Sequence, residues 1–250
     1  MRARFDALGL AFTRVAAIDA EAAPAIATAL GWRTPSLTPG EVGCALSHRL
    51  CWAKLVESEA QHCLILEDDT LLSPQAPAFL RERPFAGLDA DIIRLETFRT
   101  RVAMSRQPAV RWRRFGLHRL HSQHSGTGGY IIARALARHL LETSYNRDMA
   151  LDHFLFSPRS AVFARAHIVQ IAPALCIQEK KYARFNGVSD SDLGLRDRVR
   201  PVKARRPKRW DAERWERLAS GFLPTPRVWK RIYYEQRPLY QLLLRQRELE

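Results

Sequence analysis

An apolar stretch that runs directly into three acids is the feature that most constrains the fold of this 250-residue chain. Residues 62–69 read His-Cys-Leu-Ile-Leu-Glu-Asp-Asp. Such a continuous apolar run predicts a strand that is buried on both faces, as in parallel sheets. A second apolar segment follows at 91–96, after an expected helix over 75–83. This order predicts a β-α-β unit with a parallel strand pair, and therefore an α/β fold.

The acids at the end of the first strand predict a cation site. Ligands of open α/β sheets bind beyond the carboxyl ends of the strands, where three adjacent carboxylates repel one another unless a cation is present. Hard divalent ions such as Mg²⁺ and Mn²⁺ prefer carboxylate oxygens. If the segment stays extended, Glu67 and Asp69 face one metal and Asp68 faces the opposite side. The alternative is a solvated acidic turn before the helix that is expected near Pro74.

A helix is expected to begin after Thr38. Pro39 then occupies the first helical position, and Glu41 completes a capping box with the threonine. Apolar residues at helical spacing continue to about residue 57. Ser47 and His48 lie on this helix, although an isolated Ser-His pair is more often structural than functional.

Glycines and one isolated acid mark the second half of the candidate site. Residues 125–132 read Ser-Gly-Thr-Gly-Gly-Tyr-Ile-Ile, and a helix is expected over 135–141. Glycine lets a backbone approach a ligand closely, but the spacing does not match the dinucleotide-binding fingerprint. Asp152 interrupts the apolar run 149–156. Burial among aromatic residues would raise the pKa of its carboxyl group, which suits a general base.

The positive charge of the chain is concentrated near its C-terminus. The net charge is +14, and residues 196–250 contain 16 Lys+Arg against 7 Asp+Glu. The basic run 200–209 contains two prolines and predicts an exposed linker. Helical patterns follow over 212–220 and from about 226 onward. They suit a helix in an anionic membrane interface, or an amphipathic helix packed on its own domain.

Composition excludes several other classes of protein. With 46% hydrophobic and 26% charged residues the chain has globular composition. Because no run of about 18 uncharged apolar residues occurs, no membrane-spanning helix is expected. No export signal is expected at the N-terminus. The four cysteines show no C-x-x-C spacing, which predicts buried free thiols of a reducing cytosol, at Cys44, Cys51, Cys63 and Cys176.

Taken in order, these segments resemble glycosyltransferase family 25, which includes bacterial lipopolysaccharide glycosyltransferases and collagen galactosyltransferase domains. The most specific match is G-E-x-G-C-x-x-S-H at 40–48 followed by L-x-L-E-D-D at 64–69. Further matching passages lie at 8–19, 91–95, 128–141 and Asp152. The resemblance implies a GT-A-like, Rossmann-type, mostly parallel sheet flanked by helices. We expect this glycosyltransferase domain over 1–190 and a basic, partly helical extension over 191–250.

The resemblance also implies an activity. This activity is the transfer of a sugar from a UDP-sugar onto a glycan such as lipopolysaccharide core, with inversion of configuration at the transferred sugar. The tendency of the family favours galactose as that sugar. A divalent metal, Mn²⁺ or Mg²⁺, would be held by Glu67 and Asp69. Asp152 is the first candidate for the catalytic base, and Glu96 is the second. The residues assigned to donor binding are Ser47, His48, Asp68, Gly128 and Tyr130.

The expected partners are a UDP-sugar, a glycan or glycolipid acceptor and an anionic membrane surface, which would place the protein peripherally on the cytoplasmic face of that membrane. Family members usually open with a hydrophobic strand that is not found before residues 2–4, which suggests a late start or an impaired donor site. A catalytically impaired member is therefore one alternative. The other is a nucleic-acid-binding protein, but no zinc-finger, RRM or homeodomain pattern occurs, and the acids would repel phosphate.

Overall fold

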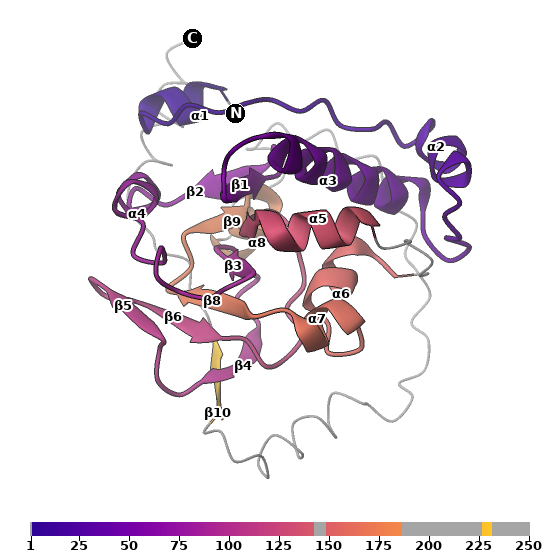
Figure 1. Cartoon of the computed structure of the whole chain (residues 1–250). Coiled ribbons are helices and arrows are strands. Elements are labelled where there is room, and N and C mark those ends of the chain that lie inside the picture. Colours follow the sequence, from indigo (N-terminus) through magenta and orange to yellow (C-terminus); the bar gives the residue numbers. More distant parts are fainter. Residues whose placement is uncertain (1, 143–148, 187–226, 232–250) are drawn as a thin grey trace.

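The computed structural model of the chain describes residues 2–142, 149–186 and 227–231 (Figure 1). Helices and strands are interspersed along these residues, which confirms the expected α/β class. The helices are α1 (Arg2–Ala7), α2 (Ala23–Ala29), α3 (Pro39–Glu57), α4 (Ala76–Glu82), α5 (Arg134–Glu142), α6 (Leu151–Phe156), α7 (Ala161–Arg165) and α8 (Glu179–Asn186). The strands are β1 (His62–Leu66), β2 (Thr70–Leu72), β3 (Ile92–Arg94), β4 (Arg101–Ser105), β5 (Val110–Trp112), β6 (Phe115–Arg119), β7 (Gly129–Ala133), β8 (Ile168–Ala172), β9 (Cys176–Gln178) and β10 (Arg227–Arg231).

The central sheet is mostly antiparallel, which corrects the expected mostly parallel, Rossmann-type sheet. Its six strands follow the order β1-β7-β3-β8-β6-β5, and only β3 and β8 pair in parallel. The predicted parallel pairing of the first two strands is also wrong. Strand β7 lies between β1 and β3 and is antiparallel to both.

Both faces of this sheet are covered, and that explains the incorrect prediction. Ile131 and Ile132 are adjacent on β7 but belong to different core clusters. One cluster packs β7 against α3, α5 and α6, and the other packs it against α4 and the aromatic residues of β5 and β6. Burial on both faces makes every position apolar whatever the direction of the neighbouring strand. The apolar runs therefore indicate strands that are covered on both faces, and they do not indicate parallel pairing.

Helix α3 begins as the sequence predicts. Thr38 is its N-cap, the Thr38 Oγ1 accepts a hydrogen bond from the Glu41 N–H at 3.3 Å, and Glu41 Oε2 accepts from the Thr38 N–H at 2.8 Å. Such an N-cap contributes about 1 kcal/mol to stability. The helix lies beside α5 over the sheet (Figure 1) and buries Trp52 and Leu55 against it. Residues 43–48 of α3 lie near the edge of the sheet at which the candidate active site forms.

The C-terminal segment differs from the sequence prediction where the structure describes it. Residues 227–231 form strand β10, antiparallel to β4, and not the beginning of a helix. A run of five residues that includes valine and tryptophan suits either periodicity, and pairing with β4 favours the strand. The expected helix over 212–220 and most of the 191–250 extension lie outside the described residues. Among those described, no helix is long and apolar enough to cross a bilayer.

Candidate active site

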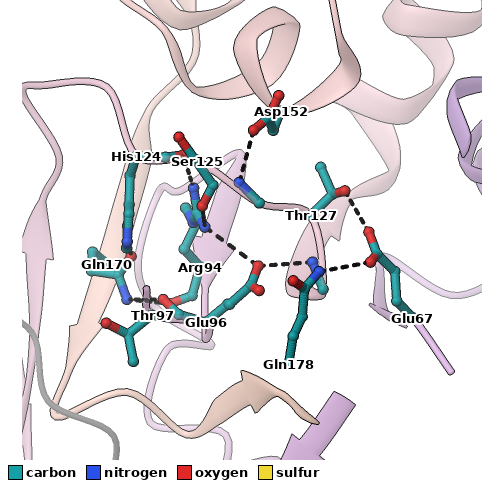
Figure 2. A network of polar contacts seen from close by, with 12 residues as sticks. Glu67, Arg94, Glu96, Thr97, His124, Ser125, Thr127, Asp152, Gln170 and Gln178 are labelled. Carbon is teal, nitrogen blue, oxygen red and sulfur yellow. Dashed lines mark hydrogen bonds and ion pairs between the residues drawn. The ribbon is translucent and has the colours of Figure 1, made fainter. Parts of the chain in front are cut away.

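Three segments meet at one edge of the central sheet. The carboxyl ends of β1 and β3 lie on either side of the amino end of β7, because β7 is antiparallel to both. Leu66 is paired with Gly129, and Arg94 is paired with Tyr130. The residues that follow β1 and β3 therefore flank the residues that precede β7. This pairing brings Glu67 and Glu96 to the glycine-containing segment 125–128 (Figure 2).

The segment 125–128 connects acids from three separate elements (Figure 2). Three successive residues each donate one hydrogen bond to a different carboxylate: Gly126 N to Asp152 Oδ2 (3.0 Å), Thr127 Oγ1 to Glu67 Oε1 (2.5 Å) and Gly128 N to Glu96 Oε2 (2.8 Å). One short stretch of backbone thus fixes the relative positions of the two candidate bases and one predicted metal ligand.

The glycines of this segment are required by close packing against Glu96. A Cβ added to Gly128 would lie 2.8 Å from Glu96 Oε1. One added to Gly126 would lie 2.8 Å from Glu96 Oε2 and 2.5 Å from Phe98 Cζ. Gly126 also has a φ of 92°, which side-chain-bearing residues rarely adopt. The sequence predicts a close approach of backbone to a ligand. In the structure the close approach is to the carboxylate of the protein itself.

Glu67 is held as an ionised carboxylate. Besides Thr127, the Gln178 Nε2 donates to its Oε2 at 2.9 Å, and His48 Nε2 lies 3.5 Å from its Oε1. Burial alone would raise the pKa of Glu67, but the hydrogen bonds from His48, Thr127 and Gln178 lower it below its ordinary value. Glu67 therefore retains its negative charge at neutral pH.

The acids 67–69 form a turn, and not the extended segment that would make alternate side chains face one metal. The Thr70 N–H donates to the Glu67 carbonyl at 3.2 Å. Asp68 is exposed, whereas Glu67 and Asp69 are partly buried. The alternative prediction of a solvated acidic turn therefore holds for Asp68 and not for its two neighbours. Burial and the charges of Glu67 and Asp68 raise the pKa of Asp69 to about 6, and Asp69 Oδ1 is buried without a hydrogen-bond donor. An unpartnered carboxylate oxygen among other acids fits a cation.

Glu96 lies beneath the segment and forms a buried pair with Arg94. The Arg94 side chain donates to the carbonyls of His124 and Ser125, the latter at 2.9 Å, and its Nη2 lies 3.5 Å from Glu96 Oε2. Burial raises the pKa of Glu96 to about 8, although Arg94 opposes this rise. Glu96 has no exposed surface. Of the two candidate bases, only the half-buried Asp152 is open to solvent in this structure.

Two neutral side chains complete this buried region. His124 Nδ1 lies 3.0 Å from Gln170 Oε1, and the Gln170 amide donates to the backbone carbonyl of Glu96 at 3.1 Å. Burial and the nearby Arg94 charge lower the pKa of His124 well below its ordinary value, so its ring is neutral. Because the Arg94 guanidinium also lies 4.1 Å from the centre of the Phe156 ring, the region joins β3, β8, α6 and the segment 125–128.

The residues assigned to donor binding are engaged with other groups of the protein. The Ser47 hydroxyl donates to the Gly43 carbonyl at 2.7 Å and accepts from the Ile18 N–H at 2.9 Å. The buried Tyr130 hydroxyl lies 2.8 Å from His48 Nδ1 and accepts from Trp52 Nε1 at 3.0 Å. The polar atoms of Ser47, His48 and Tyr130 therefore bond to other groups of the protein and hold the site in place.

The Gly128 carbonyl accepts from Thr70 Oγ1 at 2.7 Å and from the Glu67 N–H at 3.1 Å, so both polar atoms of Gly128 are occupied. Asp68 is the one residue of the predicted donor-binding set with an exposed side chain.

Sequence reasoning missed three residues that organise the site: Arg94, Thr127 and Gln178. A signal existed for Arg94, because an arginine inside an apolar strand and two residues before an acid points to a buried ion pair on one face. Thr127 lies between two glycines without a distinguishing pattern. Gln178 reaches Glu67 only through the distant pairing of β2 with β9, which no local pattern encodes.

The model of glycosyltransferase family 25, described as a lipopolysaccharide biosynthesis protein family, matches residues 1–155. The chain belongs to glycosyltransferase family 25. The matched residues carry every predicted site residue from Ser47 to Asp152. They also include Arg94 and Thr127.

Several known proteins resemble the chain over about two thirds of its length. Lipooligosaccharide biosynthesis protein lex-1 of Haemophilus influenzae is 36% identical over 185 residues, which cover 69% of this chain and 60% of that protein. The lacto-N-neotetraose biosynthesis glycosyltransferase LgtE of Neisseria gonorrhoeae is 32% identical over 64% of this chain and 61% of its own length. The lacto-N-neotetraose biosynthesis glycosyltransferase LgtB of Neisseria meningitidis serogroup B is 33% identical over 64% of this chain and 61% of its own length. The match thus spans about 60% of these relatives.

Proposed function

We propose that the protein transfers galactose from UDP-galactose to a hydroxyl group of a glycan such as lipopolysaccharide core, with inversion at the anomeric carbon. The observation that carries this proposal is the arrangement of Glu67, Glu96 and Asp152 around the segment 125–128 in a family 25 chain. The names of the relatives refer to lipooligosaccharide and lacto-N-neotetraose biosynthesis, which supports a glycan acceptor.

Asp152 is proposed as the general base. In an inverting displacement the acceptor oxygen forms a bond to the anomeric carbon while the bond from that carbon to the UDP oxygen breaks. The acceptor hydroxyl proton passes to a carboxylate. Asp152 is half-buried, and one of its oxygens is fixed by the Gly126 N–H, so its position is defined while solvent and substrate can reach it.

Glu67 and Asp69 fit a hard divalent cation, Mn²⁺ or Mg²⁺. Glu67 retains its charge, and Asp69 presents an unpartnered buried oxygen beside it. When bound, such an ion would neutralise the charge that develops on the departing UDP. The exposed Asp68, on the same turn, is proposed to contact the donor or its hydration shell.

Ser47, His48, Gly128 and Tyr130 are proposed to contribute to donor binding through the groups that they position. His48 and Tyr130 support the Glu67 carboxylate, and Gly128 holds the backbone between Glu67 and Glu96. Ser47 fixes residue 18 against α3. Substitution of these residues is expected to raise the donor KM without removing a reacting group.

We also propose that the protein works on a glycolipid acceptor at the cytoplasmic face of an anionic membrane. The support for this proposal is the charge of the C-terminal segment, where 16 Lys+Arg stand against 7 Asp+Glu over 196–250. Basic segments gain about 1 kcal/mol per Lys or Arg near an anionic membrane surface. Sedimentation with vesicles that do or do not contain anionic lipid measures this attraction.

Titration calorimetry with UDP, with and without Mn²⁺, tests the enzyme hypothesis together with a screen of UDP-sugars for turnover. The expected result is metal-dependent UDP binding, preferential turnover of UDP-galactose and an inverted anomer in the product by NMR. Salt-sensitive DNA binding without UDP binding would instead support a nucleic-acid-binding protein. Absence of both activities would indicate a catalytically impaired member of the family. Either result contradicts the proposal.

A further inference from the structure

A second cluster of metal-ligating side chains lies beside the acidic turn. Cys44 and His48 are four residues apart on α3, so they lie on the same face of the helix. Glu67 approaches that face from the end of β1. One ligand atom from each of the three residues lies within 4.8 Å of the other two. All four cysteines and all eight histidines of the chain belong to the described residues, which contain no other such group of three.

We propose that Cys44, His48 and Glu67 bind a borderline-soft divalent ion of the zinc class, with a fourth position open to water. Zn²⁺ takes thiolate, imidazole and carboxylate ligands in tetrahedral geometry, and open sites commonly have three protein ligands. The thiolate ligand distinguishes this site from one for Mg²⁺ or Mn²⁺, because those ions prefer oxygen. The site is separate in chemistry from the Glu67–Asp69 cation site proposed above, although both use Glu67.

The distances already approach those of a coordinated ion. His48 Nε2 lies 3.5 Å from Glu67 Oε1. Two ligands at about 2.0–2.1 Å from a tetrahedral zinc ion are separated by roughly 3.3 Å. Cys44 Sγ lies within 4.8 Å of a ligand atom of His48 and of one of Glu67.

The ring of His48 is oriented as a zinc ligand requires. Ligating histidines usually donate their other ring N–H to a fixed acceptor, which sets the tautomer and the ring plane. His48 Nδ1 lies 2.8 Å from the Tyr130 hydroxyl, and the two rings are stacked with an interplanar angle of 9°. The Tyr130 oxygen has two lone pairs, of which Trp52 uses one. On metal binding the second can accept a proton from Nδ1, so that the ring changes from the tautomer in which Nε2 donates to Glu67 to the one that leaves Nε2 for the metal.

Metal binding at this cluster releases one proton. In the metal-free protein burial and the Glu67 charge raise the pKa of Cys44 to about 12, so sulfur carries a proton. On binding, the S–H bond breaks, the proton passes to solvent and sulfur forms a bond to the metal without any change of oxidation state. Imidazole binds as the neutral ring, and Glu67 is already ionised.

Cobalt(II) substitution of the full-length protein tests the site without any assay of sugar transfer. Four-coordinate Co²⁺ bound to thiolate gives strong visible bands and a near-ultraviolet sulfur-to-metal charge-transfer band, and addition of Zn²⁺ should abolish both. Cys44→Ser is expected to lose the charge-transfer band. The matched control is Cys51→Ser, which changes another half-buried thiol on α3 and should retain the band.

Two further measurements keep the proposal testable if Cys44→Ser folds poorly. In the wild-type protein, Zn²⁺ should reduce alkylation of Cys44, read by peptide mass spectrometry, without protecting Cys51 or Cys63. Tyr130→Phe should weaken Zn²⁺ binding about tenfold to a hundredfold, the usual cost of removing an orienting partner. Absence of a charge-transfer band, its persistence in a folded Cys44→Ser variant, or equal labelling of Cys44 with and without Zn²⁺ would overturn the assignment. None of these outcomes depends on whether the protein transfers sugar.

Discussion

Glu67 and Glu96 bond to neighbouring residues of the same backbone segment, yet their surroundings give them opposite properties. Glu67 is partly exposed, accepts side-chain donors at both oxygens and has a lowered pKa. Glu96 is fully buried, leaves one oxygen without a donor and has a pKa raised to about 8. Identical carboxyl groups thus form a charged rim and a neutral floor of the site. The rim suits contact with substrates, and the floor suits positioning of the segment between them.

Removal of the arginine in the floor should have the largest effect on stability. Arg94→Met leaves the buried carbonyls of His124 and Ser125 without their donor, so we expect the free energy of unfolding to fall by about 3–5 kcal/mol. Urea denaturation measures the change. The control is Arg106→Met, the same substitution at an exposed arginine, which should change stability by less than about 0.5 kcal/mol. Similar losses in both variants would contradict a buried positioning role for Arg94.

The same substitution in the two glutamates should separate rim from floor. Glu67→Gln removes a charge from the rim and should lower the rate of sugar transfer about 10²–10³-fold. Glu96→Gln replaces a carboxyl group that is already neutral at pH 7, and should keep the rate within about threefold of wild type. Steady-state kinetics at pH 7 compares them. A larger loss in Glu96→Gln than in Glu67→Gln would reverse the assignment and favour Glu96 as the base.

Close packing of the glycine segment on the floor predicts an intermediate effect. Gly128→Ala places a methyl group 2.8 Å from Glu96 Oε1 and 3.1 Å from Gln178 Cγ, so stability should fall by about 1–3 kcal/mol. Gly40→Ala, on α3, meets no atom within 4 Å and should leave stability unchanged or slightly higher. Thermal unfolding of the two variants provides the comparison. Equal transition temperatures would show that the segment 125–128 can move to accommodate the methyl group, and would contradict the close packing against Glu96.

Over a single pH unit, the pH dependence of stability should be the smallest effect, and its sign follows from Glu96. Its folded pKa of about 8 exceeds the ordinary value of 4.5, so the folded state binds more protons than the unfolded state between these pH values. Stability therefore falls as pH rises through this window, by at most about 1.4 kcal/mol per pH unit. Glu96→Gln should remove this contribution. Parallel pH profiles for wild type and variant from pH 5 to about pH 8 would contradict the raised pKa.

The sequence was sufficient for features that depend on local chemistry. The capping box at Thr38 and Glu41 forms as predicted, because both partners lie within one turn. The apolar run at 62–66 and the acids after it were also located correctly. Strand direction was not predictable, because burial on both faces erases the alternation by which a one-sided antiparallel strand is recognised. The insertion of β7 between β1 and β3 depends on pairing across more than sixty residues of chain.

The same distinction holds for the site. Glu67, Glu96 and Asp152 were identified from the sequence as acids in unusual positions, whereas their connection through residues 126–128 depends on where three elements end. In the C-terminal segment the local pattern was misleading. Helical spacing predicted a helix from about residue 226, but residues 227–231 pair with β4 as strand β10. Local patterns therefore identified the candidate groups, and the sheet topology determines their arrangement.

The transfer rate of Asp152→Asn is the most direct test of the account. Asparagine retains one oxygen that can accept the Gly126 N–H, so the segment should stay in place. It loses the second acceptor, which the exposed His153 N–H uses at 2.8 Å, so stability should fall by only about 0.5–1.5 kcal/mol. It cannot accept the acceptor proton, and loss of a general base lowers rates about 10²–10⁴-fold. We predict a fall of this size in UDP release from UDP-galactose with a glycan acceptor, with the unfolding transition preserved. A rate near that of wild type would contradict the proposed site.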